Sequence, residues 1–207
     1  MTRFVLASAS PARLEVLRHA GVEPVVRVSG VDEDALTAEL GDDPAPDDVV
    51  VTLARAKAEA VLEEFDDAVV VGCDSMLSIG GVLYGKPHTV DVARERWALM
   101  AGKSGDLLTG HAVVRVSGGR VVAVAAECSS TTIHFAEPSA GDLEAYLATG
   151  EPLSVAGAFT LDGLGGWFVD RIEGDPSSVI GIGLPLVRRL LTEVGTSLAD
   201  IWSSADQ

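Results

Sequence analysis

An apolar strand that runs directly into a helix opens the chain, and this unit limits the fold more than any other feature of the sequence. Residues 4–6 read FVL, which is typical of a strand, and Leu14 and Leu17 begin a helical spacing of apolar residues soon after it. Ser10 and Pro11 suit the N-cap and the first position of that helix. The sequence therefore predicts a strand, a short loop and a helix at the N-terminus.

Antiparallel hairpins further along the chain add a second constraint. Long apolar strands lie within residues 66–87 and 106–135, and glycine pairs at 80–81 and 118–119 mark their turns. Asp47 or Asp48 is expected to cap a helix. Helices are predicted over residues 47–65, 89–102, 139–150 and 184–195. Strand–helix units combined with hairpins predict an α/β fold with a mixed sheet.

Composition restricts the partners of this chain. Its 207 residues fit one generous domain or two small lobes, and 47% of them are hydrophobic. Its net charge is −16. Duplex DNA and anionic membranes require a basic face, so they are not expected as main partners. The sequence has no apolar run of 18 residues and no hydrophobic signal region, and we expect a soluble, cytoplasmic protein. Cys73 and Cys128 fall in apolar strands, where packed, reduced thiols are expected.

Arg13 is unusual because it falls in the first turn of a helix. A helix N-terminus carries partial positive charge and ordinarily favours Asp or Glu. An anion between the helix end and the guanidinium would explain the arginine, and the hydroxyls of Ser8 and Ser10 would help to bind a phosphate there. A surface arginine in solvent is the alternative that this stretch leaves open.

Lys57 falls on the apolar stripe of its helix. Leu53 and Val61 lie four residues to either side of it. A lysine on an inward face is costly to desolvate unless it meets an anion. The alternative is that its ammonium group extends to the rim of the structure.

Asp74 follows the apolar run AVVVGC, where a carboxylate is unexpected. Ligand sites of α/β proteins often lie near strand ends, and a carboxylate there could bind a metal or act as a general base for water. An Asp that only ends strand pairing is the alternative. The apolar pattern resumes at Met76 and Leu77, so the strand is expected to continue past Asp74.

Two further charged residues complete the candidate set. Lys86 lies on the return arm of the hairpin after Asp74, and a two-residue turn would place it opposite Ser75. Glu33, in the acidic stretch VDED, is the preferred second carboxylate for a metal, although acidic triplets are usually solvated.

Several common catalytic motifs are absent from the sequence. It contains no G-x-S-x-G, no G-x-x-x-x-G-K-[ST], and no G-x-G-x-x-G between a strand and a helix. A histidine falls near a strand start in TGHAVV, but a hydrolase triad is rejected for lack of a nucleophile motif. The chain's histidines are too scattered to predict a metal site; they are His19, His88, His111 and His134.

The ordered set of motifs resembles the Maf family of nucleotide pyrophosphatases over nearly the whole chain. The motifs are LASASPAR, VDED, LARAKA, GCDSM, GKP, TGH, AGAFTLDGLGGWFVDRIEGDPSSVIG and LPL. The resemblance implies one domain over residues 1–207, with an elongated α/β fold and a cleft between two lobes, related to the inosine triphosphate pyrophosphatase type. A homodimer is favoured only by this resemblance.

The resemblance also implies an activity. It is the hydrolysis of a nucleoside triphosphate to the monophosphate and pyrophosphate with a divalent cation, Mg²⁺ or Mn²⁺. The matching positions put Ser8, Ser10 and Arg13 in the phosphate loop, Glu33 and Asp74 in the acidic metal and catalytic set, and Lys57 and Lys86 in the cationic set.

The base preference stays open at this point. The subgroup acting on dTTP and UTP typically has Thr and Gln where this chain has Ser75 and Asp162, and the subgroup acting on 7-methylated GTP has Trp where this chain has Ala12. Two other interpretations of the sequence stay open. One is a nucleotide-sensing or division-related binding protein with incidental hydrolysis, and the other is the inosine triphosphate enzyme itself.

Overall fold

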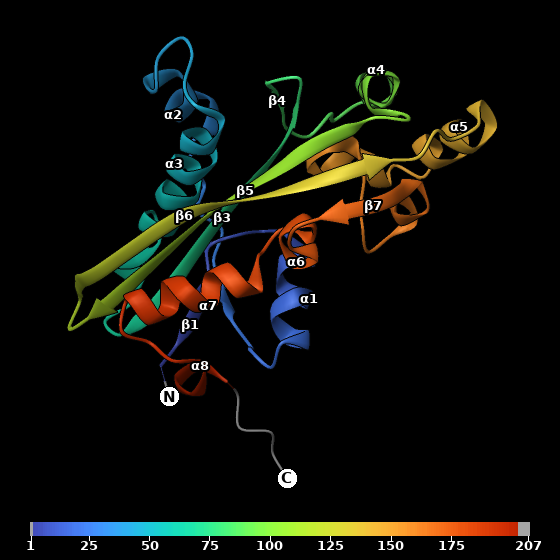
Figure 1. Ribbon diagram of the computed structural model, residues 1–207. Helices are drawn as coiled ribbons and strands as arrows, with labels where there is room; N and C mark the ends of the chain where they lie inside the picture. Colours follow the sequence, from blue (N-terminus) through green and yellow to red (C-terminus); the bar gives the residue numbers. More distant parts are fainter. Residues whose placement is uncertain (1, 203–207) are drawn as a thin grey trace. The chain divides into compact units, whose positions relative to one another are not determined.

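The computed structural model describes residues 2–202 and shows a mixed α/β fold with a seven-stranded sheet (Figure 1). The strands are β1 (Phe4–Leu6), β2 (Val25–Val26), β3 (Ala68–Ile79), β4 (Val82–Tyr84), β5 (Ser104–Ser117), β6 (Arg120–Phe135) and β7 (Val169–Glu173). The α-helices are α1 (Pro11–His19), α2 (Glu33–Glu39), α3 (Pro46–Glu59), α4 (Val90–Met100), α5 (Ala140–Ala148), α6 (Pro176–Ile180), α7 (Leu184–Glu193) and α8 (Leu198–Ile201). The 3₁₀ helices are η1 (Leu62–Glu64), η2 (Glu151–Ser154), η3 (Ala156–Ala158) and η4 (Leu164–Phe168).

Parallel and antiparallel strand pairs occur in the same sheet. The strand order is β2-β1-β3-β5-β6-β7, and β4 pairs with β3 beside this path. Parallel pairing joins β1 to both β2 and β3, whereas β4 pairs antiparallel with β3, and β7 with β6. The predicted mixed sheet is therefore confirmed.

The chain divides into two compact units. The first unit comprises Met1–Asp74, Thr109–Ser129 and Gly181–Gln207, and the second comprises Ser75–Leu108 and Ser130–Ile180. Each unit has its own hydrophobic core, because the residues of each buried cluster come from one unit only. Within residues 2–202, none of the helices is both long enough and apolar enough to span a bilayer.

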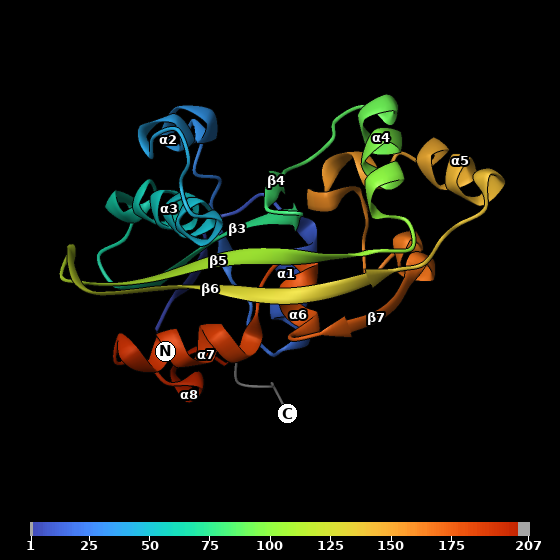
Figure 2. The same cartoon turned by 45° about the horizontal axis from the view of Figure 1, so that its top comes forward.

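Helices cover both faces of the strands in the first unit. Figure 2 shows α1, α7 and α8 on one face and α3 on the other. The side chains of β1 follow this division, since Phe4 and Leu6 join the cluster under α1 and α7 while Val5 joins the cluster under α3. This is the two-residue alternation of a strand that is buried on both faces.

An aromatic core organises the second unit. The fully buried ring of Trp97 on α4 meets Phe135, Tyr146 and Phe168 at distances of 5.6–6.1 Å between ring centroids, with steep interplanar angles. Its Nε1 donates to the Ala158 carbonyl at 2.9 Å. This bond satisfies the one polar atom of a side chain that is otherwise apolar.

The observed helix starts can be compared with the predicted N-cap residues. Ser10 and Ser139 cap α1 and α5, as expected for α1 and close to the expected start of α5. The prediction that Asp47 or Asp48 caps the next helix was wrong, because Pro46 takes the first helical position and both aspartates lie in the first turn. This helix, α3, also ends at Glu59, short of residue 65.

Gly72 on β3 allows α3 to lie unusually close to the sheet. A Cβ atom at Gly72 would lie 2.1 Å from the carbonyl oxygen of Ala54. Gly72→Ala is therefore expected to lower the free energy of unfolding by about 3 kcal/mol, measured by urea denaturation. Gly85→Ala is the matched control, since a Cβ there meets no atom within 4 Å. Equal stability losses in the two variants would contradict this account of the packing.

Candidate functional site

The ammonium group of Lys57 lies between two carboxylates in the first unit. Its Nζ is 2.6 Å from Oδ1 of Asp74 and 2.8 Å from Oε1 of Glu33. The side chains of Lys57 and Asp74 are only 10% and 8% exposed, whereas that of Glu33 is 51% exposed. Lys57 thus meets anions at a buried position, which is the arrangement that a lysine on an apolar helix stripe requires.

Local structure explains how these side chains meet. Lys57 shares the buried face of α3 with Leu53, and Val61 just beyond the helix is also buried. Asp74 lies within β3, which continues to Ile79, so the prediction that the strand does not stop at Asp74 is confirmed. Glu33 is the first residue of α2, where the helix dipole favours a carboxylate.

The two carboxylate oxygens of Asp74 differ in their surroundings, because Oδ1 contacts Lys57. Oδ2 is buried, and within residues 2–202 no group donates a hydrogen bond to it. A buried acceptor without a donor is costly for the folded protein, more so when it carries charge. An oxygen in this state is suited to accept a proton from water or to bind a cation.

The donor set fits a divalent cation of the Mg²⁺ or Mn²⁺ type. Groups of three or more His, Cys, Asp or Glu with metal-binding geometry do not occur in the described part of the chain. Mg²⁺ is usually held by one or two carboxylates together with substrate phosphates and water. Glu33 and Asp74, which share Lys57 as a neighbour, could supply such carboxylates, and Oδ2 of Asp74 is an oxygen of the kind that Mg²⁺ binds.

The guanidinium of Arg13 is held against the N-terminus of α1. Its Nη1 donates to Oγ of Ser8 at 3.0 Å, and its Nε donates to the carbonyl of Gly181 at 2.7 Å. Ser8 Oγ also accepts from the backbone N–H of Ser10 at 3.2 Å, and Ser10 Oγ caps the helix. The loop therefore gathers two hydroxyls, a guanidinium and a helix N-terminus, as the sequence suggested.

His111 is a buried residue whose place in the fold was not predicted. It lies in the middle of β5 and not at a strand start, with no exposed surface. Its Nε2 accepts the backbone N–H of Gly183 at 2.7 Å, which requires a neutral ring with the proton on Nδ1. Burial, helped by the positive charge of Arg13, lowers the pKa of His111 from 6.5 to about 4. The only sequence signal was a histidine within an apolar strand pattern.

This buried histidine predicts a loss of stability in acid. Because its pKa is lower in the folded chain than in the unfolded chain, the unfolded chain binds more protons between pH 6.5 and about 4. The stabilisation is complete above pH 6.5 and is lost as the pH falls toward 4, by about 3 kcal/mol in all.

Urea denaturation between pH 7.5 and 4.5 measures this effect. The wild type is expected to lose more unfolding free energy than His111→Gln over this range. Parallel curves for the two proteins would contradict the assignment.

Lys86 and the thiols complete the list of predicted positions. Lys86 is exposed and follows β4 in the second unit, so its membership of the cationic set stays a prediction.

Cys73 and Cys128 form no disulfide and lie in strands, as expected. Burial raises the pKa of the Cys73 thiol to about 11, which keeps it uncharged beside Asp74.

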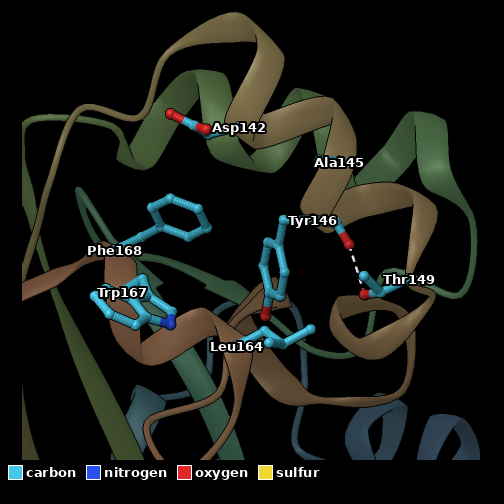
Figure 3. A pocket seen from close by; sticks show the side chains of 7 residues that line it. All are labelled: Asp142, Ala145, Tyr146, Thr149, Leu164, Trp167 and Phe168. Atoms are coloured by element: carbon cyan, nitrogen blue, oxygen red, sulfur yellow. Dashed lines mark hydrogen bonds between the residues drawn. The ribbon is translucent and has the colours of Figure 1, made fainter.

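A separate pocket lies in the second unit, between α5 and η4 (Figure 3). It has a volume of about 490 Å³ and is lined mainly by apolar side chains, among them Tyr146, Leu164, Trp167 and Phe168. Trp167 is 84% exposed. None of the predicted site residues lines this pocket, and its lining suits an apolar group better than a polyphosphate.

Comparison with known proteins gives one matching family model and several relatives that share one name. The family model described as "Maf-like protein" matches residues 3–194. A protein of Rhodococcus opacus (strain B4) named "Nucleoside triphosphate pyrophosphatase" is 70% identical over 210 residues, covering 99% of this chain and 98% of that protein. Proteins with the same name from Nocardia farcinica (strain IFM 10152) and Mycobacterium leprae (strain Br4923) are 68% and 58% identical, over 96% and 99% of this chain and 96% and 98% of their own lengths.

Proposed function

Since this chain belongs to the Maf-like protein family, we propose that it hydrolyses a nucleoside triphosphate to the monophosphate and pyrophosphate. The observation that carries the proposal is the contact of Lys57 with the buried Asp74 and the half-exposed Glu33, together with the buried Oδ2 of Asp74, to which no group within residues 2–202 donates a hydrogen bond. The names of the relatives support the same reaction.

The N-terminus of α1 is proposed to bind the phosphates. Ser8, Ser10 and Arg13 gather there, and the helix end adds its own partial positive charge. The positive charge of Arg13 and of the helix end offsets part of the repulsion between a polyphosphate and a chain of net charge −16. Lys86 is proposed as a further cation of the set.

Glu33 and Asp74 are the residues that would hold Mg²⁺ or Mn²⁺. When bound, the cation neutralises phosphate charge and lowers the pKa of water. Lys57 contacts both carboxylates and keeps them in place.

The proposed reaction is attack of water on the α-phosphorus. Asp74 takes a proton from the water as a general base, a bond forms between the water oxygen and the α-phosphorus, and the bond from the α-phosphorus to the bridging oxygen breaks. Pyrophosphate leaves with the bonding electrons. The cationic side chains stabilise the charge that develops on the leaving group, as is usual where positioning and electrostatics dominate catalysis.

The test is a substrate panel. The purified protein with Mg²⁺ or Mn²⁺ is offered canonical triphosphates and modified ones, including dTTP, UTP, 7-methyl-GTP, ITP and XTP, and pyrophosphate is measured. Release of pyrophosphate from at least one substrate is expected, and the panel also gives the base preference. Orthophosphate as the first product would contradict the reaction, and tight binding without turnover on every substrate would favour a sensing role.

A further inference from the structure

The segment Gly181–Gly183 enters α7 and is fixed at three successive residues in the first unit. The carbonyl of Gly181 accepts from Arg13 Nε at 2.7 Å, and the backbone N–H of Gly183 donates to His111 Nε2 at 2.7 Å. Between them, the side chain of Ile182 is fully buried in the core under α1 and α7. The histidine and the arginine therefore hold opposite ends of one three-residue segment.

The absence of a side chain at Gly181 allows Arg13 to lie close to the backbone. Its φ of +131° is a conformation that L side chains rarely adopt, and a Cβ there would lie 3.1 Å from Arg13 Nε. The carbonyl of Gly181 is one of the groups that position the Arg13 guanidinium, together with Oγ of Ser8. A shift of the segment would therefore be transmitted to the guanidinium.

His111 supplies the hydrogen-bond acceptor for the backbone N–H of Gly183. Gly183 is the N-cap residue of α7, and its own backbone N–H is among the donors at the helix start that no bond within the helix can satisfy. A neutral imidazole buried in the sheet supplies that acceptor, and its ring is fixed by the packing around it. The proposed reaction does not use this histidine chemically.

We propose that His111 is a positioning residue for Arg13. By accepting the Gly183 N–H it fixes the Gly181 carbonyl, which in turn orients the guanidinium toward the phosphates. The proposal rests on the phosphate-binding role of Arg13 given above. It implies that loss of His111 weakens phosphate binding only while Arg13 is present.

A double-mutant cycle with inorganic tripolyphosphate as the probe tests this coupling. Binding is measured by isothermal titration calorimetry with Mg²⁺ at pH 7.5 for the wild type, His111→Phe, Arg13→Ala and the double variant. We expect Arg13→Ala to weaken binding about 30-fold, as for loss of charged hydrogen bonds, and His111→Phe about 5-fold. In the Arg13→Ala background, His111→Phe should change the dissociation constant less than about 2-fold.

Two further variants separate positioning from folding. Gly183→Pro removes the donated N–H while leaving His111 in the core, and the φ of −77° at Gly183 is compatible with proline. It should reproduce the loss seen in His111→Phe, whereas His111→Gln, which retains an acceptor, should recover most of the binding. His134→Phe, in the second unit, is the control and should bind like the wild type.

Full additivity of the two losses in the cycle, or unchanged binding in both His111→Phe and Gly183→Pro, would overturn the proposal. Tripolyphosphate binding does not require turnover. A protein that shows the coupling without releasing pyrophosphate would therefore refute the proposed function alone, and an active enzyme without the coupling would refute only the role of His111.

Discussion

Replacement of Asp74 by asparagine is expected to lower the turnover of nucleoside triphosphate by about 1,000-fold. Asparagine matches the shape of aspartate but cannot accept a proton from water, and it offers weaker binding to a cation. The side chain is 8% exposed and bonded to Lys57, so the amide has little room to adopt another arrangement. Steady-state pyrophosphate release with saturating substrate and Mg²⁺ measures the effect.

Asp67→Asn is the matched control for this experiment. Asp67 is exposed, directly precedes β3, which also carries Asp74, and accepts a hydrogen bond from Ser117. Its replacement should leave turnover within about 2-fold of the wild type, as is usual for surface changes away from a site. A turnover in Asp74→Asn within about 10-fold of the wild type would remove Asp74 from the role of general base.

Replacement of Lys57 by methionine is expected to damage both stability and turnover. Methionine fills a similar volume but leaves Asp74 as a buried charge without its partner, and breaking a buried ion pair in this way costs about 3 kcal/mol or more of unfolding free energy. Turnover should fall about 100-fold because Asp74 and Glu33 both lose the ammonium group that they contact and are no longer held in place. Urea denaturation and pyrophosphate release measure the two effects.

The double variant Lys57→Met, Asp74→Asn separates the two contributions. Without the uncompensated charge, it should recover much of the lost stability while remaining inactive. Lys103→Met, at an exposed lysine, is the control and should behave like the wild type in both measurements. An unfolding free energy that is unchanged in Lys57→Met would contradict the buried ion pair.

The pattern of apolar residues was sufficient to predict much of the architecture. The glycine pairs at 80–81 and 118–119 turn the two hairpins, and both pairs have positive φ angles. Period-two and helical spacings depend only on which face of an element is buried, so they can be interpreted without knowing the partner element. The short helices α6 and α8 were missed, because four or five residues are too few to show a helical period.

The candidate site was only partly predictable for a related reason. Lys57 and Asp74 interrupt apolar patterns, and such interruptions are visible in a sequence because a buried charge needs a partner. His111 contacts Gly183, 72 residues further along the chain, through one backbone N–H. A bond to a backbone group is not marked by any residue type at the other end, so the sequence could not indicate it.

The position of bond cleavage tests the central claim most directly. Turnover is carried out in H₂¹⁸O with the preferred triphosphate, and the products are separated and analysed by mass spectrometry. Attack on the α-phosphorus places one ¹⁸O atom in the nucleoside monophosphate and none in the pyrophosphate. Label in pyrophosphate or in orthophosphate, with an unlabelled nucleotide, would contradict the account.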